Sequence, residues 1–417
     1  MPNNIEKVTL KNGLQVHFYE DDTKHSTYVC LVTHFGGMDT DFYLDEKPYH
    51  IPNGIAHMIE HLLIEKSPYQ NLLHTFGEMQ LSCNGATYTY HTRYYFEGVE
   101  KIEEALTILL HGIEEPCFTA SDVEEVKPAI YEEIRRGNDN KWKQLDGLKN
   151  KAFFQNIPFI STLGTLQDVE SITYEMVKQT YEAFYRPSNQ ILLVAGCYNK
   201  EKILAKIEDI FEEIPVSEKS FHKKEYQEPQ TVKEKVLEKK MPVAEDLICL
   251  CYKIASDAYA PKEQVKLTYY FNYFMMMNFG LTSPFYQEAI EEKLITEPLY
   301  HELYKMDAYL CLEIGGYTKN SDRLMEKIKQ QMEHPLFDEE LFDMYKKNDK
   351  VEIAIRPESL AAIGEPYLEN LLLYQYGNLD TVEDIENFSF SEFTKTMQEI
   401  DFSHHVICKI VPEETEV

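Results

Sequence analysis

Three residues on one short segment have the types and the spacing that a metal-dependent hydrolase requires. His57, Glu60 and His61 form an H-x-x-E-H pattern within NGIAHMIEHLL. Residues four apart on a helix share a face, so both imidazoles can reach one ion, and Glu60 joins that face. Two imidazoles, one further ligand and an open position for water describe a catalytic zinc site. A carboxylate beside that water can take its proton as the water attacks a carbonyl group.

The same pattern also has an ordinary structural interpretation. A five-residue pattern occurs by chance, and a stripe of His and Glu can be a solvated helix face. Apolar residues nevertheless surround the pattern closely: Ile55, Ala56, Met58, Ile59, Leu62, Leu63 and Ile64. A helix that is apolar nearly all round is buried, and burial of two His and a Glu without a partner costs several kcal/mol. The pattern therefore favours a metal site.

A third ligand has to come from another segment. The helix predicted over VKPAIYEEIRRGNDN offers two adjacent carboxylates, Glu132 and Glu133. Taken alone, these are typical of the solvated face of an acidic helix. The residues themselves leave open whether either of them binds a metal.

The surrounding elements have to place these residues. A helix is expected over about residues 53–65, directly after Pro52, with strands before it over LQVHFYE and TYVCLVTHF. The segment QLSCNGATYTYHTRYYFEG alternates aromatic, Thr and small residues, as strands do. Helical spacing follows in KIEEALTILLHGIEE and in DVEEVKPAIYEEIRR.

The second half of the chain repeats the order of elements in the first half. One alignment pairs Pro116 with Pro335 and Glu133 with Glu352. This indicates two copies of one α/β domain, each a sheet with helices packed against it. We predict a zinc-bearing domain over residues 1–215, a charged linker over 216–236, and a homologous domain without a metal site over 237–417.

The composition argues against several classes of function. The chain has 41 Lys and Arg against 71 Asp and Glu, a net charge of −30, which repels nucleic acid and anionic membranes. No stretch approaches ~18 uncharged apolar residues, and the first residues lack the apolar segment of a signal peptide. The eight cysteines form no CxxC pair. We therefore expect reduced thiols and a cytoplasmic location.

Five segments, in their order and spacing, resemble the pitrilysin/insulinase family of zinc metallopeptidases, which includes the mitochondrial processing peptidase. They are LKNGLQV, NGIAHMIEHLL, CNGATYTYHTRYYF, PAIYEEIRRGNDN and EAFYRPSNQILLVAG. The resemblance is nearest to the bacterial, single-site subgroup whose two-domain chains work in pairs. It implies an α+β fold of two homologous domains, each a mainly antiparallel sheet with flanking helices. Such a chain forms half of a clamshell chamber around a peptide.

The resemblance also implies roles for single residues. His57 and His61 match the zinc ligands, and Glu60 matches the general base. Glu133 matches the distal carboxylate ligand. Asn84 matches an Asn that holds the substrate backbone on the strand beside the zinc, where an open edge can accept an extended peptide.

The chain departs from the family pattern at several positions. Val126 stands where the family usually has a Glu seven residues before the ligand, which leaves Glu132 open as the ligand. In the second domain the resemblance implies an Arg and a Tyr that clamp the substrate. The chain has Lys293 and Tyr300 there. Lys does not reproduce the bidentate fork of Arg.

We therefore expect a zinc-dependent endopeptidase that cleaves peptides or leader sequences inside a closed chamber. The missing Arg predicts a heterodimer in which a homologous partner chain supplies an Arg and a Tyr. A homodimer and a chain that is active alone are the alternatives. The second hypothesis is a noncatalytic, peptide-binding subunit of a heterodimeric peptidase. The sequence names neither the substrate nor the cleavage position.

Overall fold

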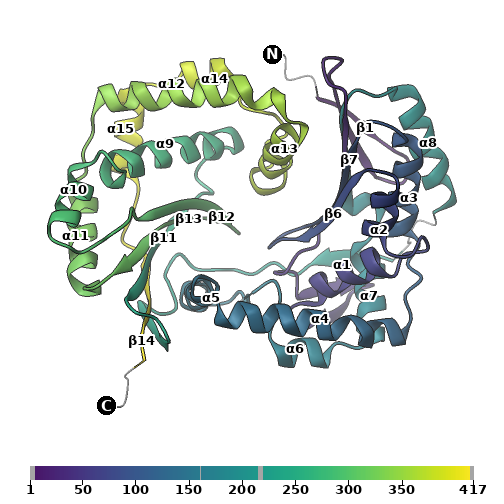
Figure 1. Cartoon of the computed structure of the whole chain (residues 1–417), viewed down its shortest axis with the longest axis horizontal. Coiled ribbons are helices and arrows are strands. Elements are labelled where there is room, and N and C mark those ends of the chain that lie inside the picture. The colour runs from purple at the N-terminus through teal and green to yellow at the C-terminus, as the bar shows by residue number, and fades with distance from the viewer. Residues whose placement is uncertain (1–4, 160, 215–218, 414–417) are drawn as a thin grey trace. The chain divides into compact units, whose positions relative to one another are not determined.

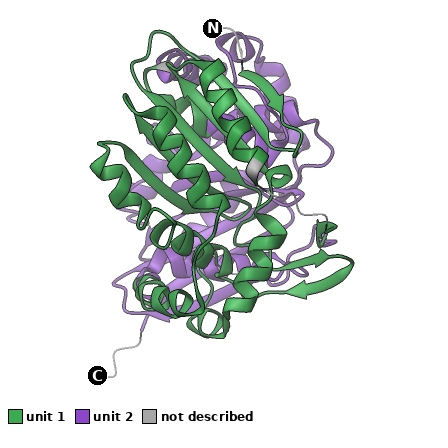
Figure 2. Ribbon diagram, turned by 90° about the vertical axis from the view of Figure 1, so that its right-hand side faces the viewer, with its two compact units in different colours: residues 1–136, 161–225, 358–365 green, residues 137–160, 226–357, 366–417 purple. Residues whose placement is uncertain are grey.

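The chain forms two compact units in the computed structural model, which describes residues 5–159, 161–214 and 219–413 (Figures 1 and 2). Unit 1 comprises residues 1–136, 161–225 and 358–365. Unit 2 comprises residues 137–160, 226–357 and 366–417. Each unit has its own sheet and its own buried core.

Unit 1 is built on a six-stranded sheet in the order β1-β2-β8-β3-β7-β6. Its central strands β3 and β8 are buried along their whole length, as their continuous apolar sequences predict. Strand β6 pairs only with β7, so it forms an edge of the sheet. The strands are β1 (Ile5–Thr9), β2 (Gln15–Glu20), β3 (Thr27–Thr33), β6 (Ser82–Thr87), β7 (Thr92–Gly98) and β8 (Gln190–Gly196), with a smaller sheet of β4 (Asp41–Leu44), β5 (Lys47–His50) and β9 (Phe221–Lys223).

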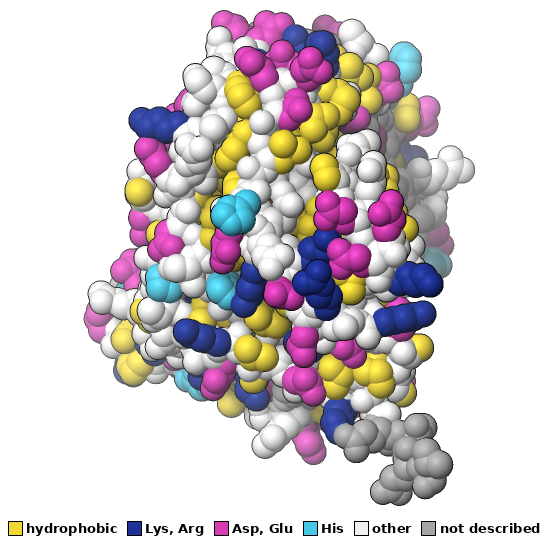
Figure 3. All heavy atoms as spheres, turned by 90° about the vertical axis from the view of Figure 1, so that its left-hand side faces the viewer, with side chains coloured by type: hydrophobic (Ala, Val, Ile, Leu, Met, Phe, Trp, Pro, Cys, Tyr) yellow, Lys and Arg dark blue, Asp and Glu magenta, His cyan; other side chains and the backbone are white. Residues whose placement is uncertain are grey.

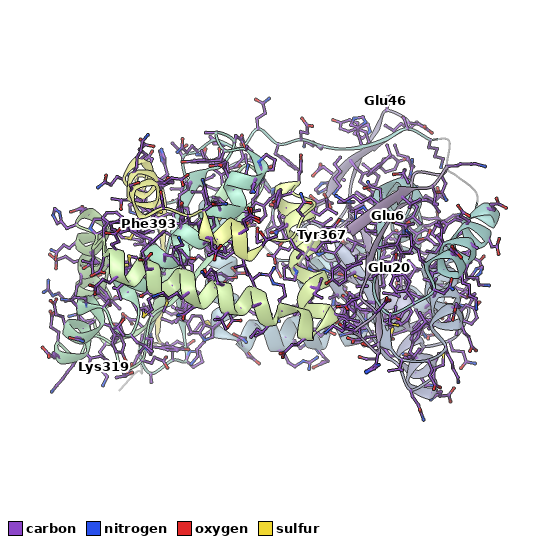
Figure 4. All side chains as sticks on the ribbon, turned by 90° about the horizontal axis from the view of Figure 1, so that it is seen from above. Glu6, Glu20, Glu46, Lys319, Tyr367 and Phe393 are labelled. Carbon is purple, nitrogen blue, oxygen red and sulfur yellow. The ribbon has the colours of Figure 1, made fainter. Side chains whose placement is uncertain are left out.

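The helices of unit 1 bury apolar faces in the core of this sheet. They are α1 (Ile55–Glu65), α2 (Leu72–Glu78), α3 (Ile102–Glu114), α4 (Ala120–Asp139), α6 (Leu166–Ser171), α7 (Tyr174–Phe184) and α8 (Lys200–Glu213). Helix α8 is also tied to the sheet by charge, because Lys200 forms ion pairs with Glu6 of β1 and Glu20 of β2. These two carboxylates lie on neighbouring strands (Figure 4).

Unit 2 repeats the topology of unit 1 except for strand β1, which has no counterpart. Its five-stranded sheet has the order β10-β14-β11-β13-β12. Strands β10 and β14 are parallel, and the other strand pairs of this sheet are antiparallel. In unit 1 the corresponding parallel pair is β2 and β8. The predicted fold of two homologous α/β domains with mainly antiparallel sheets is therefore confirmed. The strands are β10 (Val236–Met241), β11 (Asp246–Ala255), β12 (Tyr300–Met306), β13 (Tyr309–Thr318) and β14 (His405–Pro412).

The helices of unit 2 cover its sheet and form an aromatic core. They are α5 (Lys141–Phe153), α9 (Pro261–Phe279), α10 (Pro284–Glu291), α11 (Ser321–Glu333), α12 (Glu339–Ile355), α13 (Leu360–Tyr374, which begins in unit 1), α14 (Val382–Glu386) and α15 (Phe390–Glu399). Helix α9 corresponds to α1 in the repeat, and its Tyr270 and Phe274 are buried as packing residues. Phe393 of α15 is buried in the same core and is labelled in Figure 4.

The compact units differ from the predicted domain boundaries. Helix α5 falls within the predicted residues 1–215, yet it packs against β10, β11 and β14 of unit 2. Hydrophobic periodicity shows that a helix has an apolar face, but it does not show which sheet that face covers. The predicted boundary at residues 215 and 216 lies outside the described residues.

The predicted linker over residues 216–236 is more structured than its charged composition suggests. Strand β9 pairs with β4, so the first part of the segment belongs to unit 1. Further on, the buried Glu228 carboxylate accepts a hydrogen bond from Lys253 at 2.7 Å and from the backbone N–H of Gln155 at 2.9 Å. A buried charge is stable only with such partners, and composition alone does not reveal them.

The surface carries charges of both signs. On the face shown in Figure 3, acidic and basic side chains are interspersed, with apolar side chains between them. Among the helices of the described residues, none has the length and apolar character needed to cross a membrane.

Candidate metal centre

Helix α1 presents the H-x-x-E-H residues from within the core of unit 1. The helix begins after Gly54, whose φ is +87° and where a Cβ atom would lie 2.4 Å from the Leu163 carbonyl oxygen. Only glycine adopts that conformation in that space without strain. The following helix buries its apolar residues around His57. The helical period then places His61 one turn further along the same face.

The structure brings His57, His61 and Glu133 together. The Nε2 atom of His57 lies 3.4 Å from Oε2 of Glu133, and Nε2 of His61 lies 3.5 Å from Oε1 of the same carboxylate. One ligand atom from each residue lies within 4.8 Å of the other two. Within the part of the chain that the structure describes, this is the one group of three such side chains.

These distances fit a zinc ion. Zn²⁺ binds His nitrogen and carboxylate oxygen at about 2.0–2.2 Å in tetrahedral geometry, so neighbouring ligand atoms stand roughly 3.3–3.5 Å apart. The separations of 3.4 and 3.5 Å between Glu133 and the two imidazoles lie in that range. Two imidazoles and one carboxylate also leave the fourth position open, as in catalytic rather than structural zinc sites.

Helix α4 carries Glu133 to the cluster because its apolar residues fix its rotation. Val126, Ile130 and Ile134 of α4 are buried in the core of unit 1. Glu133 is next to that face, and its side chain is 30% exposed. Glu132 points elsewhere: its side chain is 63% exposed and forms an ion pair with Arg135. Of the two adjacent carboxylates, only that of Glu133 lies beside the histidines.

Glu60 lies beside the cluster without joining it. Its Oε2 atom accepts a hydrogen bond of 2.6 Å from the Thr87 hydroxyl on strand β6. Burial raises the pKa of the Glu60 carboxyl, and the hydrogen bond from Thr87 partly opposes that rise. A Cβ atom on Gly85, also on β6, would stand 3.2 Å from Oε1 of Glu60. The side chain is thus held by one hydrogen bond and by the space that glycine leaves.

Two residues that orient this site, Glu65 and Thr87, were not among the residues predicted from the sequence. Nδ1 of His61 lies 2.8 Å from Oε1 of Glu65. An ionised carboxylate can only accept a hydrogen bond, so Nδ1 carries the proton and Nε2 presents its lone pair towards Glu133. The spacing of four residues between His61 and Glu65 on one helix was a usable signal. Thr87 gave no such signal, because its contact with Glu60 comes from the packing of α1 against β6.

The two predicted substrate-binding residues lie in different units. Asn84 is exposed on the edge strand β6, one residue before Gly85, and its Oδ1 accepts the Gly85 N–H at 2.9 Å. Tyr300 begins the edge strand β12 of unit 2, and its hydroxyl donates to Oε2 of Glu313 at 3.5 Å. Lys293, at the position where the resemblance implies an Arg, is exposed in the turn after α10.

Comparisons with known proteins agree with this fold. Residues 17–165 match the family described as Insulinase (Peptidase family M16), and residues 171–348 match the description Peptidase M16 inactive domain. Over 417 aligned residues the chain is 27% identical to YmfH of Bacillus subtilis, an uncharacterized zinc protease, with 97% of this chain and 96% of YmfH covered.

Two further proteins are similar to this chain, one in sequence and one in fold. The chain is 26% identical to mitochondrial-processing peptidase subunit beta of Dictyostelium discoideum over 176 residues, which is 40% of this chain and 37% of that protein. An M16-like peptidase from Alicyclobacillus acidocaldarius has a similar fold, with a TM-score of 0.89 over 99% of each chain and a sequence identity of 24%.

Proposed function

Because the chain belongs to the insulinase family of peptidases, family M16, we propose that it is a zinc-dependent endopeptidase that cleaves peptides or leader sequences. The observation that carries this proposal is the convergence of His57, His61 and Glu133, with the Glu60 carboxyl beside them. YmfH, similar over nearly its whole length, is named a zinc protease. Zinc is accordingly the cofactor that we assign.

The chain's own residues would share the work of peptide hydrolysis. His57, His61 and Glu133 would hold the ion, which when bound supplies a Lewis acid for the scissile carbonyl group. Glu60 takes a proton from the attacking water and passes it to the leaving amine. An extended substrate would pair with the edge of β6, which has one free side, and Asn84 of that strand would hold the substrate backbone.

We further propose that a homologous partner chain completes the active chamber. The support is the exposed Lys293, where the family resemblance implies a substrate-clamping Arg, together with a relative that is named as a subunit. A preorganised donor for the developing oxyanion is worth about 10²–10³-fold in rate. A cytoplasmic location is proposed as well, because all eight cysteines are free and reducing compartments keep thiols in that state.

A noncatalytic subunit is the competing function. Residues 171–348 match a family description that contains the words inactive domain, and Lys293 departs from the Arg of the family pattern. The complete H-x-x-E-H pattern and the placement of Glu133 argue for the peptidase, because a chain with no hydrolytic role has no need of them.

The experiment that tests the proposal combines metal analysis with peptide cleavage. The purified full chain should carry about one zinc per chain. It should cleave unstructured peptides, either alone or after addition of a candidate partner, and phenanthroline should abolish cleavage until zinc is restored. If the chain carries no zinc and cleaves no peptide, either alone or with the partner, it is the noncatalytic subunit. Full activity of the isolated chain, unchanged by the partner, contradicts the heterodimer only.

Gly85 provides a more local test of the Glu60 geometry. In Gly85→Ala the new methyl group would approach Cγ and Oε1 of Glu60 to 3.2 Å, so the carboxylate has to shift by a few tenths of an ångström. We expect kcat to fall severalfold to about 100-fold, because small displacements of a catalytic group are costly, while zinc content stays the same. Gly77→Ala is the matched control, since a Cβ atom there meets nothing within 4 Å. Equal kcat values for the two variants would show that Gly85 does not position Glu60.

A further inference from the structure

Arg93 is a buried cation that lacks a counter-ion. It lies on strand β7 of unit 1 and is 6% exposed. Its one hydrogen bond to a residue that the structure describes runs from Nε to Nε2 of His91, at 2.8 Å. Burial and the charge of Arg93 lower the pKa of His91 to about 3, so this imidazole is neutral. The positive charge of Arg93 therefore has no negative partner.

The other buried Lys and Arg side chains of the described chain all have strong acceptors. Four lysines form ion pairs with carboxylates, and one arginine donates to two backbone carbonyl groups. These residues are Lys127, Lys149, Lys253, Lys327 and Arg186. Burial of a charge without such partners is costly. Arg93 is the exception, and the terminal nitrogens of its guanidinium remain available to an acceptor.

The groups around Arg93 favour an anion as that acceptor. His91 accepts through Nε2, so its Nδ1 carries the proton, and this buried N–H finds no acceptor within the described residues. The ring of Tyr88 lies 4.4 Å from the guanidinium and is itself exposed, so the charge lies just below the surface. Glu365, in the part of α13 that belongs to unit 1, forms no ion pair with Arg93. The surroundings thus offer donors without a bonded carboxylate.

Arg93 lies on a sheet face that a substrate strand at β6 would share. Strands β6 and β7 lie side by side (Figure 1), with Ala86 opposite Arg93 and Asn84 opposite Tyr95. Directly opposite residues point to the same face, whereas Tyr94 points to the core. A strand added at β6 would lie two strand spacings, about 9.6 Å, from β7. Because Ala86 is small, a Glu side chain of the added strand can reach Arg93 across it.

We propose that Arg93 binds the side-chain carboxylate of an acidic residue in a substrate strand that pairs with β6. The planar guanidinium donates two parallel hydrogen bonds to the carboxylate. An acidic substrate residue near the position opposite Ala86 is therefore a determinant of specificity. The position of the substrate rests on the proposed function. The recognition of a carboxylate does not, because it depends on Arg93 and its neighbours in unit 1.

Peptide binding to the Glu60→Gln chain tests the proposal, because this variant suppresses turnover. The first two probes are amidated Gly-Ser peptides with an uncharged fluorophore, one with a central Glu and one with Gln in its place. The third is the Gln peptide with a free C-terminal carboxylate. Fluorescence anisotropy should show that the Glu peptide binds about tenfold more tightly than the amidated Gln peptide. The net charge of −30 opposes this preference at long range, so only a local cation explains it.

Substitutions then assign the preference to Arg93. Arg93→Gln should bind both amidated peptides as weakly as the parent chain binds the Gln peptide. Arg93→Lys keeps the charge without the fork and should retain part of the preference, which covers a Gln variant that does not fold. Arg323→Gln makes the same change at an exposed, ion-paired residue of α11 and is the matched control. Equal binding of the Glu and Gln peptides, or a preference that survives in Arg93→Gln, overturns the proposal. An equal gain from the free C-terminus overturns the side chain as the source of the carboxylate.

A small probe separates this outcome from failure of the proposed peptidase. N-acetylglutamate amide should raise the melting temperature of the wild-type chain and leave that of Arg93→Gln unchanged, because only the wild type binds it. N-acetylglutamine amide should shift neither. A shift with the acidic probe but no binding of any peptide contradicts the proposed function and leaves the carboxylate site standing. No shift with the acidic probe and no preference between the peptides overturns the carboxylate site itself.

Discussion

Glu60→Gln is expected to lower kcat on an unstructured peptide by about 10²–10⁴-fold, the usual contribution of general acid–base catalysis. The amide has nearly the size of the carboxyl and can still accept the hydrogen bond from Thr87, but it cannot take a proton from water. Glu60 is outside the group of three convergent ligand atoms, so the zinc content should equal that of the wild type. Steady-state cleavage and elemental analysis of the same preparation measure both quantities.

The control for this variant is Glu78→Gln, which changes an exposed carboxylate on α2 of the same unit. It should have the kcat and the zinc content of the wild type. A Glu60→Gln chain that keeps its turnover would remove Glu60 from the mechanism. A chain that loses both turnover and zinc would instead make Glu60 a ligand, and the division of roles on helix α1 would be wrong.

His57→Ala is expected to weaken zinc binding by more than about 100-fold and to abolish peptide cleavage. Loss of a residue that merely orients a ligand typically costs 10–100-fold in metal affinity, and loss of a ligand itself should cost more. The remaining His61 and Glu133 offer two ligand atoms, too few for a stable site. Competition with a chromophoric chelator measures the affinity, and circular dichroism checks that the chain is folded.

The adjacent carboxylates on α4 give a matched pair for the third ligand. Glu133→Gln should release zinc, because its two oxygens lie 3.4 and 3.5 Å from the two imidazoles. Glu132→Gln should retain zinc, because Glu132 is paired with Arg135 at the surface. The two variants make the same chemical change one residue apart. Loss of zinc from Glu132→Gln, with retention in Glu133→Gln, would reverse the assignment.

The local geometry of the metal centre was available from the sequence. An α-helix repeats every 3.6 residues, so the spacing of His57, Glu60 and His61 places them on one face wherever the helix lies. The apolar residues between them similarly predicted a buried helix, and α1 is buried as expected. The internal repeat was visible too, because two copies of one fold need the same order of elements, and the two sheets share their topology.

The sequence by itself thus determined the elements, their repetition and the chemistry of helix α1. The tertiary structure decided which residues from distant segments contact helix α1 and the two sheets. Nothing local distinguishes Glu133 from Glu132; the rotation of α4, set by its buried apolar face, turns only Glu133 to the histidines. Nothing local assigns α5 to unit 2, where it brings Trp142 and Lys149 to Tyr300 and Glu313. Hydrophobic periodicity depends on residues that are near one another along the chain. The contacts of Glu133 and of α5 depend instead on which apolar faces pack against each other and exclude water. Only the folded chain determines that pairing of faces.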